Sequence, residues 1–519
     1  NAMITISPHT RDWDRLAEAT GDPSWHSDAM WKYFQRIERC QYLARPRDAG
    51  DETANPSRHG FAGWLPTSLP DPKIALRDGQ LVKIIAGAAA AAFDEAKAEG
   101  RLVGDLQRKL LLTGFDPNDA RNVGSGAEGV YLVPLATEGG RRAGTREYLR
   151  RVQAACPGNL VVRTGALVTR VLFDGDQRAI GVEYLRGERI YRADRQVGPD
   201  PPATTETVRV LREVVLAAGA FNTPQLLELS GVGPRPELAR LGIDTRVDLP
   251  GVGENLQDRY EVGVVLEMAE PFSLLEGARF EEPANGRDPD DPLFREWRAG
   301  RGAYTTNGAV IAIVTRSSDA QPDPDLILFG LAGRFAGYYP GYSRDVTGDR
   351  RFFTWAILKA HTRNTAGQVT LRTPDPRDPP DVNFRYFEEG NDPTGEDLAA
   401  VVTGVEYVRR ITRKIGSRVK REVLPGPDVR SRAQIEEFVQ THAWGHHACG
   451  SCKMGPATDP MAVVDSRFRV HGTKGLRVVD ASVFPRIPGF FIVTPIYMIS
   501  EKATDVLLAD ATGGTGRGA

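Results

Sequence analysis

The first hundred residues carry a helical pattern of apolar side chains, interrupted by one polar stretch. Apolar residues recur at helical spacing over residues 28–40, and Ser27 can cap this helix. Residues 74–100 hold a second, Ala-rich helix. Between the two, residues 45–75 are rich in Pro, Gly and charged side chains. We therefore expect two helices joined by an ordered surface loop.

Strand patterns follow in the middle of the chain. Residues 159–187 alternate as strands, with a hairpin signal at Asp174-Gly175. Residues 208–218 are β-branched and apolar, which predicts a further strand. The same criteria predict strands of a second sheet over 323–329 and 352–358, and a helix over 396–415. Strands mixed with helices, and long loops that return to an earlier sheet, predict an α/β domain plus an α+β domain.

Composition narrows the class of protein. A chain of 519 residues is too long for one compact core, which predicts two or more domains. With 41% hydrophobic and 26% charged residues, it is neither disordered, collagen-like nor coiled coil. A net charge of −2 argues against a nucleic-acid or anionic-membrane partner. The longest apolar run, 84–93, is half a membrane span, and four cysteines are too few for a disulfide framework at this size.

The chain opens with Asn1-Ala2-Met3. This is either a cloning scar before a start Met or the interior of a longer protein. Because any signal peptide is then out of view, a cytoplasmic location is only the default expectation.

One literal match to the dinucleotide-binding pattern G-x-G-x-x-G lies at residues 124–129. A strand pattern, residues 130–133, follows it, so no helix N-terminus is available to face a pyrophosphate. Glu128 inside the loop would also repel that group. We interpret the match as a Gly-rich turn.

Two later segments share a design in which a strand ends and a capped helix begins. In the first, Val214 to Ala218 is a strand, Thr223 can cap, and Pro224 is the first helical residue. In the second, residues 476–482 precede a helix that opens at Thr494-Pro495. The positive end of a helix stabilises an anion, and small residues allow a flat ligand to approach. Taken alone, each segment favours a capped helix with no ligand.

A cluster of His and Cys occupies residues 441–456, with His442, His446, His447, Cys449 and Cys452. A zinc site on His447 and the two cysteines lacks a second ligand pair. A redox Cys pair lacks a thioredoxin-like surrounding. The remaining alternatives are a buried, structural His pair and a His general base held in a low-dielectric pocket.

Several linked motifs, in the right order, resemble the glucose–methanol–choline (GMC) family of flavin-dependent oxidoreductases. They are 219–233 (GAFNTPQLLELSGVG), 250–258 (PGVGENLQD), 447–455 (HACGSCKMG), 475–482 (GLRVVDAS) and the helix from Thr494. The similarity runs from the first helix to about Leu508, and Asn1-Ala2-Met3 is similar to the N-x-M that follows the family's Gly-Gly element.

The resemblance implies an FAD-binding domain of incomplete Rossmann type and a substrate domain built on a large antiparallel sheet. The FAD domain is expected to be assembled from 1–40, 150–265 and 440–512, and the substrate domain and lid from 41–149 and 266–439. The family's first segment, with a strand, a G-x-G-x-x-G loop and an acidic ribose ligand, is not found. We therefore expect the N-terminal nucleotide-binding segment to be lacking and FAD binding to be weak or absent.

The resemblance also implies the reaction, oxidation of an alcohol to an aldehyde or ketone. His447 matches the family's active-site His, which takes the hydroxyl proton while hydride passes to flavin N5. The family's usual second catalytic group, His or Asn, falls on Phe491, which cannot form a useful hydrogen bond. We therefore expect His447 to act as the sole base, with His446 lining the site. Arg259, where the family often has His, is expected to be structural.

The implied FAD contacts come from several segments. Val168 would contact adenine through its backbone, and Asp480 and Ala481 would lie by the pyrophosphate and ribityl chain. Ile492 and Val493 would present backbone N–H groups to the flavin pyrimidine edge, and the helix start would favour negative charge on the reduced flavin. The remaining residues of the predicted cofactor-binding set are Asn1, Gly219, Ala220, Phe491 and Thr494.

We therefore predict a soluble, FAD-dependent alcohol oxidase or dehydrogenase with no metal. Its partners are a small-molecule alcohol and an electron acceptor, oxygen or another, but neither nucleic acid nor membrane. One alternative is a family member without net redox chemistry, such as a hydroxynitrile-lyase-like protein. Another is a non-catalytic fragment that binds no flavin.

Overall fold

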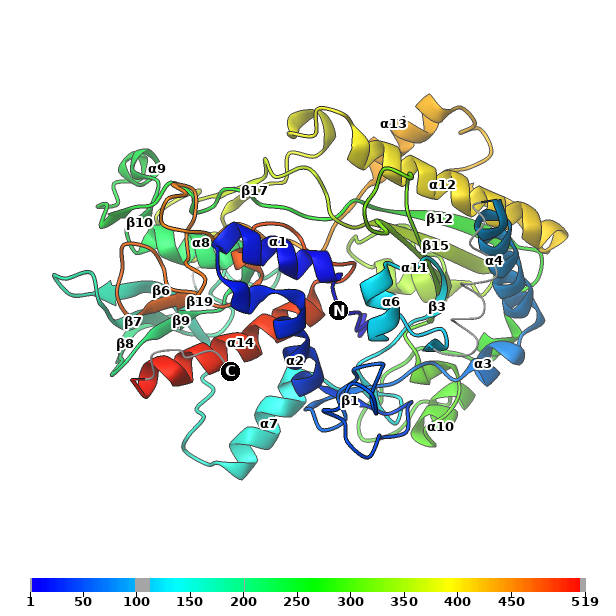
Figure 1. Ribbon diagram of the computed structural model, residues 1–519, viewed down its shortest axis with the longest axis horizontal. Coiled ribbons are helices and arrows are strands. Elements are labelled where there is room, and N and C mark those ends of the chain that lie inside the picture. The colour runs from blue at the N-terminus through cyan, green and yellow to red at the C-terminus, as the bar shows by residue number, and fades with distance from the viewer. Residues whose placement is uncertain (1, 99–112, 200, 514–519) are drawn as a thin grey trace.

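The computed structural model describes residues 2–98, 113–199 and 201–513. Figure 1 shows small sheets and helices gathered at one end of the molecule and a larger sheet with its own helices at the other. Each end has its own hydrophobic core, one around Trp25, Phe34 and Val478 and the other around Phe353 and Trp355. The proposed division into an FAD domain and a substrate domain remains a prediction.

The first core includes two consecutive N-terminal helices and the C-terminal helix. They are α1 (Thr10–Thr20), α2 (Ser27–Ile37) and α14 (Val493–Ala511). The helix expected over 28–40 forms but ends at Ile37. Residues 38–40 instead form strand β1 (Glu38–Cys40), which pairs in parallel with β2 (Leu65–Thr67).

The strand predicted over 208–218 is two strands in two different sheets. Strand β8 (Thr204–Arg209) joins β6 (Ala166–Phe173) and β7 (Ala179–Arg186) in an antiparallel sheet. The hairpin predicted at residues 174–175 connects β6 to β7, with Asp174 N donating to the Arg178 carbonyl at 3.0 Å. After a turn at the exposed Leu211, β9 (Val214–Leu216) pairs in parallel with β19 (Leu476–Val478). Residues 159–165, expected as a strand, do not form one.

A six-stranded antiparallel sheet dominates the other end, as the resemblance implied. Its strand order is β18-β12-β15-β14-β13-β3. The strands are β18 (Val419–Leu424), β12 (Glu261–Met268), β15 (Phe352–Lys359), β14 (Leu326–Ala332), β13 (Ala309–Thr315) and β3 (Gly129–Leu132). Helices α4 (Gly79–Ala98) and α12 (Glu396–Ile415) lie at the same end (Figure 1), and β12 is buried along its whole length.

The remaining elements are short and connect these layers. The helices are α3 (Pro72–Leu76), α6 (Ala120–Ser125), α7 (Thr145–Ala155), α8 (Gly219–Leu229), α9 (Arg235–Arg240), α10 (Pro292–Arg298), α11 (Tyr342–Gly348) and α13 (Arg432–His442). The strands are β4 (Thr137–Glu138), β5 (Arg141–Arg142), β10 (Val232–Gly233), β11 (Val247–Asp248), β16 (Gln368–Thr370) and β17 (Asp381–Asn383).

The Gly-rich match at 124–129 is a turn, as interpreted from the sequence. Helix α6 ends at Ser125, Gly126 takes a left-handed conformation with φ of 56°, and β3 begins at Gly129. The chain therefore runs from helix to strand here, the reverse of a phosphate-binding loop. The Glu128 carboxylate is buried and accepts from the Arg316 guanidinium at 2.8 Å, so its role is structural.

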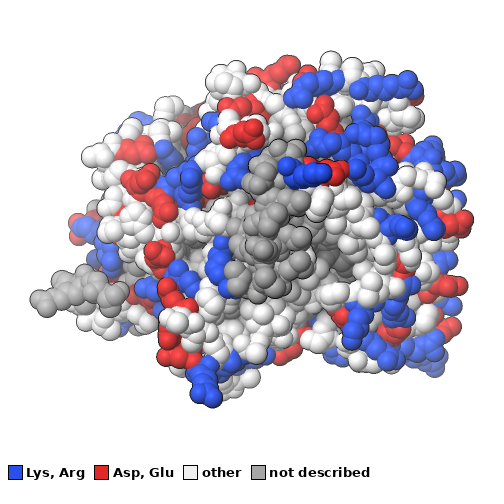
Figure 2. All heavy atoms as spheres, turned by 45° about the vertical axis from the view of Figure 1, so that its right-hand side comes forward, with Lys and Arg blue, Asp and Glu red and all other residues white. Residues whose placement is uncertain are grey.

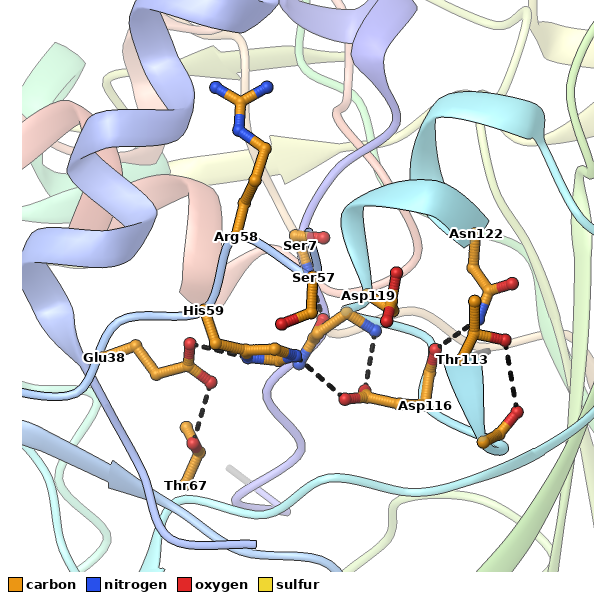
Figure 3. Close-up of polar contacts among 12 residues, drawn as sticks. Ser7, Glu38, Ser57, Arg58, His59, Thr67, Thr113, Asp116, Asp119 and Asn122 are labelled. Carbon is orange, nitrogen blue, oxygen red and sulfur yellow. Dashed lines mark hydrogen bonds and ion pairs between the residues drawn. The ribbon is translucent and has the colours of Figure 1, made fainter. Parts of the chain in front are cut away.

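The Pro- and Gly-rich loop after β1 is held by a buried charge cluster (Figure 3). The ring nitrogens of His59 lie 2.8 Å from Glu38 Oε2 and 3.0 Å from Asp116 Oδ2. Glu38 Oε1 also accepts from the Thr67 hydroxyl at 2.8 Å. Burial alone would lower the pKa of His59, but the two carboxylates raise it well above its usual range. The cluster ties the loop to β1 and to the segment before α6.

The distribution of charged side chains on the surface agrees with the near-zero net charge of the sequence. Figure 2 shows Lys and Arg intermingled with Asp and Glu over the face that it presents. Among the described residues, no helix combines the length and the apolar character needed to cross a membrane.

Candidate active site

His446 and His447 lie in a short segment that pairs with the start of β12. Backbone bridges join Trp444 to Glu261 and Cys449 to Gln257. Between these bridges, residues 445–448 oppose residues 258–260, so the His-bearing side has one extra residue. Such a bulge re-aims side chains, and here it carries the His pair.

The imidazole of His447 is buried at the amino end of α14. Its ring centroid lies 5.7 Å from that of Phe491, two residues before the helix begins. The His447 backbone N–H donates to Asp258 Oδ1 at 2.8 Å, which fixes the bulge. Burial, reinforced by the nearby Arg259 cation, holds the pKa of His447 well below its usual range. The ring is therefore neutral near pH 7 and has a free lone pair.

Glu261, which sequence reasoning missed, faces both histidines. Its Oε1 lies 3.2 Å from Nδ1 of His447 and 3.3 Å from Nδ1 of His446. Burial and the neighbouring Asp258 raise the pKa of Glu261 well above its usual range. The available signal was an acidic residue directly before the apolar run at residues 262–266.

The two histidines differ in exposure. The His446 side chain is 34% exposed, against 7% for His447, and its ring packs edge-on against Tyr338 at 4.8 Å. Burial of the His446 ring lowers its pKa to about 4. His446 thus lines the outer side of the site, and His447 lies inside.

Arg259 is also fully buried beside this site. Its Nη2 donates to the Pro488 carbonyl at 2.6 Å, whereas Nε and Nη1 find no partner among the described residues. Burial lowers the pKa of Arg259 to about 10. Pro488 borders a cavity of about 380 Å³ that also contacts Asp12 and His361 but neither histidine of the pair.

The amino end of α14 is open to a ligand. The helix begins at Val493, no side chain caps it, and the buried Thr494 hydroxyl has no partner among the described residues. A cavity of about 280 Å³ lies at this end, lined by Val493 and Tyr497 and by Met3 and Thr5. Uncapped N–H groups beside a cavity suit the polar edge of a flat, electron-rich ring. Of the predicted residues, Val493 lines this cavity, and contact of Ile492 and Thr494 with a flavin remains a prediction.

A second group of predicted residues meets at the ends of β9 and β19. Asp480 Oδ2 accepts from Gly219 N at 2.9 Å and from the Thr223 hydroxyl at 2.6 Å. Helix α8 therefore begins at Gly219, four residues before the expected cap, because Asp480 caps it from outside. Pro224 lies inside the helix, where it leaves the Ala220 carbonyl free, and Ser451 Oγ donates to that carbonyl at 2.5 Å.

One segment joins the His pair to the residues around Asp480 and Gly219. Residues 447–452 run from the His pair to Ala220 through Ser451, and Gly450 N donates to the Ala481 carbonyl at 3.2 Å. Val168 lies in β6, where Val171 N donates to Oγ of Ser230, the residue that follows α8. Asn1, also predicted to bind the cofactor, lies outside the described residues.

The cysteines take no part in the cluster. Cys449 and Cys452 are free and buried, and burial raises the pKa of both thiols above their usual range. Among the described residues, the potential ligands grouped with His447 are Glu261 and His446. The zinc site on Cys449 and Cys452 and the redox Cys pair are therefore not supported.

Comparisons with known proteins identify a family that matches most of the chain. The family described as GMC oxidoreductase matches residues 1–261 and, through its C-terminal model, residues 363–500. The chain is 33% identical over 513 residues to an oxygen-dependent choline dehydrogenase of Pseudomonas putida, covering 97% of the chain and 78% of that protein. It is 29% identical over 525 residues to a Brucella anthropi protein of the same name, covering 98% and 80%.

Solved structures show the same fold. An Aspergillus oryzae formate oxidase superimposes with a TM-score of 0.77 at 21% identity, covering 99% of this chain and 83% of that one. A pyridoxine 4-oxidase from Mesorbium loti superimposes with a TM-score of 0.70 at 22% identity, covering 97% and 82%.

One expectation from the sequence is corrected by the family match. The N-terminal model matches from residue 1, so the view that the chain lacks the N-terminal segment is not borne out. The weak FAD binding argued from that absence loses its basis.

Proposed function

The chain belongs to the GMC oxidoreductase family, and from this premise we propose that His447 is the general base in the oxidation of an alcohol. As a member, the protein is an FAD-dependent oxidoreductase that acts on alcohol groups. The observation that carries the proposal is the buried, neutral imidazole of His447, packed on Phe491 at the uncapped amino end of α14.

The cofactor would be held by the residues that meet around α14 and α8. Ile492, Val493 and Thr494 would offer backbone N–H groups to the flavin ring. Gly219 and Ala481 would lie along the rest of the FAD molecule. FAD supplies the acceptor for the hydride that leaves the alcohol carbon. The segments 1–40, 150–265 and 440–512 are accordingly proposed as the FAD-binding half.

His447 would take the hydroxyl proton of the alcohol as the carbonyl product forms. The low pKa of His447 keeps the lone pair available at neutral pH, and burial excludes competing water. Glu261 Oε1, 3.2 Å from Nδ1, can stabilise the imidazolium that results. Because Phe491 cannot share the proton, we propose that His447 acts as the only base and that His446 lines the entrance.

The walls of the site suggest an alcohol that carries a cationic head. The aromatic rings of Phe335, Tyr338 and Trp444 gather beside His446, with the Phe335 ring 5.1 Å from Tyr338 and 5.6 Å from Trp444. Aromatic faces and a buried carboxyl such as Glu261 attract quaternary ammonium groups. The similar dehydrogenases are named for choline, so we propose choline-like amino alcohols as the first substrates to test.

Anaerobic titration of the FAD-loaded protein tests this function. We expect choline, or a related alcohol, to bleach the flavin absorbance, with one carbonyl product formed per flavin reduced. A stable flavin spectrum that no alcohol bleaches would instead favour a non-redox family member. A protein that retains no flavin after saturation would favour the non-catalytic fragment.

A further inference from the structure

We propose that Glu261, His446 and His447 form a zinc site that silences the enzyme when it is filled. The metal site itself rests only on the geometry of these three side chains. Its effect on catalysis also rests on the proposed role of His447 as the base, so the two parts need separate readouts.

Three potential ligand atoms converge, and two of the separations between them are tetrahedral. Glu261 Oε1 lies 3.2 Å from Nδ1 of His447 and 3.3 Å from Nδ1 of His446. One ligand atom from each of the three side chains lies within 4.8 Å of the others. Zinc holds His nitrogen and carboxylate oxygen at about 2.0–2.1 Å, so the ligands of a tetrahedral site are about 3.3 Å apart. Two of the three separations therefore already match the edges of a zinc tetrahedron.

An ordinary ion pair explains this arrangement poorly. Both imidazoles direct the same nitrogen, Nδ1, to the same oxygen, and one proton can bridge that oxygen to only one ring. Neither contact is a hydrogen bond. His447 Nδ1 and Glu261 Oε1 are both buried without a hydrogen-bond partner among the described residues. Buried polar atoms left unpaired are costly, and a shared cation would satisfy all three at once.

The backbone holds these ligands in place before any metal binds. Backbone bridges at Trp444 and Cys449 flank the two histidines, and Asp258 Oδ1 accepts from the His447 N–H. Because His446 is the exposed member, the fourth coordination position lies toward solvent, where water can complete the shell. The buried Arg259 cation would repel a Zn²⁺ ion bound here. The carboxyl groups of Asp258 and Glu261, buried beside it, offset that repulsion.

Two imidazoles and one carboxylate favour zinc over the hard cations. Mg²⁺ and Ca²⁺ prefer six or more oxygen ligands, and this cluster offers one carboxylate. Imidazole and carboxylate suit Zn²⁺, and Co²⁺ can occupy the same geometry as a spectroscopic substitute.

A zinc-bound His447 could not take a proton from the substrate. Coordination occupies the Nδ1 lone pair, and a neutral imidazole then carries its proton on Nε2. Whichever nitrogen is the base in the free enzyme, the filled site leaves it without a lone pair. The metal also blocks the approach to the ring from the side of His446.

The test measures metal binding apart from activity. Calorimetry of the chelator-treated, FAD-loaded protein is expected to show one Zn²⁺ bound per chain, and Co²⁺ is expected to give the visible absorption of a tetrahedral complex. His446→Gln and Glu261→Gln should each weaken Zn²⁺ binding by more than about 100-fold, since loss of outer-sphere partners alone costs up to that much. His442→Gln, also an exposed His near this segment, should bind Zn²⁺ like the parent protein.

Each outcome bears on one part of the proposal. Absence of Zn²⁺ binding by a folded parent protein would overturn the site, as would unchanged binding in both His446→Gln and Glu261→Gln. Zn²⁺ binding that is weakened in His446→Gln and Glu261→Gln supports the zinc site, whatever effect zinc has on the rate of flavin reduction. If such binding left the rate of flavin reduction unaffected, the zinc site would stand and the assignment of His447 as base would fall.

Discussion

At the scale of single residues, the charge state of His447 decides what the site can do. Burial keeps its imidazole neutral, and burial together with Asp258 raises the pKa of the neighbouring Glu261. His447 therefore starts uncharged, and Glu261 Oε1 lies 3.2 Å from the ring nitrogen Nδ1 when the ring accepts a proton. This is the environment in which a general base can take a proton without first losing one.

The low pKa of His447 sets the pH dependence of flavin reduction. A lowered pKa means that protonation, and hence loss of the base, occurs only below the usual His value of about 6.5. We expect the rate of flavin reduction to stay level from about pH 8 down to about pH 6.5 and to fall at lower pH. Stopped-flow measurements over this range provide the check. A rate that already halves above about pH 6.5 would contradict a depressed pKa.

At the scale of elements, the fold depends on buried charge and on close packing between layers. The His59 cluster holds a polar loop against β1 where apolar side chains are few. At the other end of the molecule, Gly404 lets α12 approach β15, because a Cβ at this position would come within 2.5 Å of Ile357.

Replacement of His59 by Gln should destabilise the protein in a pH-dependent way. Removing the cation leaves Glu38 and Asp116 buried without it, at a cost of about 3–5 kcal/mol. Because the folded-state pKa of His59 is raised, its contribution is complete below about pH 6.5 and is lost as pH rises through that folded value. Urea unfolding should therefore show a larger deficit at pH 6 than at alkaline pH.

The exposed His26 offers the control for this prediction. His26→Gln breaks only a solvent-exposed contact with Asp14, so a change within about 0.5 kcal/mol is expected. Equal losses in the two variants, or a His59→Gln deficit that grows with pH, would show that His59 is not the charged centre of the cluster.

Two Gly-to-Ala variants in helices separate packing from helix propensity. Gly404→Ala places a methyl group against the buried Ile357, whereas Gly124→Ala in α6 meets nothing within 4 Å. Both gain the same helix propensity, so Gly404→Ala should be less stable than Gly124→Ala by about 1–3 kcal/mol. Thermal unfolding of the two variants measures the difference. Equal stability would mean that α12 and β15 do not pack this closely.

Sequence patterns predicted the elements more completely than the contacts between them. Apolar periodicity found α2, α4 and α12 and three strands of the large sheet, β3, β14 and β15, because each depends on local burial. It did not find the other three strands, β12, β13 and β18. The division of residues 204–216 between two sheets depends on pairing with β7 and β19, which no local pattern records. The helix start at Gly219 was missed for the same reason, since Asp480 caps it from more than 200 residues away.

At the scale of the whole molecule, the site lies where segments from distant parts of the chain meet. The His-bearing segment pairs with the start of β12 in the large sheet, and Phe491 leads into α14 of the first core. Phe491 contacts His447 on one side and Phe329 of β14 on the other. The motif around His447 was readable in the sequence, whereas Glu261 became visible only when β12 placed it there.

The most direct test of the account compares flavin reduction in His447→Ala and His442→Ala. The two variants make the same substitution a few residues apart, but only His447 lies inside the site. With a saturating alcohol and no oxygen, His447→Ala should reduce its bound flavin about 10²- to 10⁴-fold more slowly than the parent, and His442→Ala should match the parent. A His447→Ala protein that holds FAD and is reduced at the parent rate would contradict the assignment of His447 as the base.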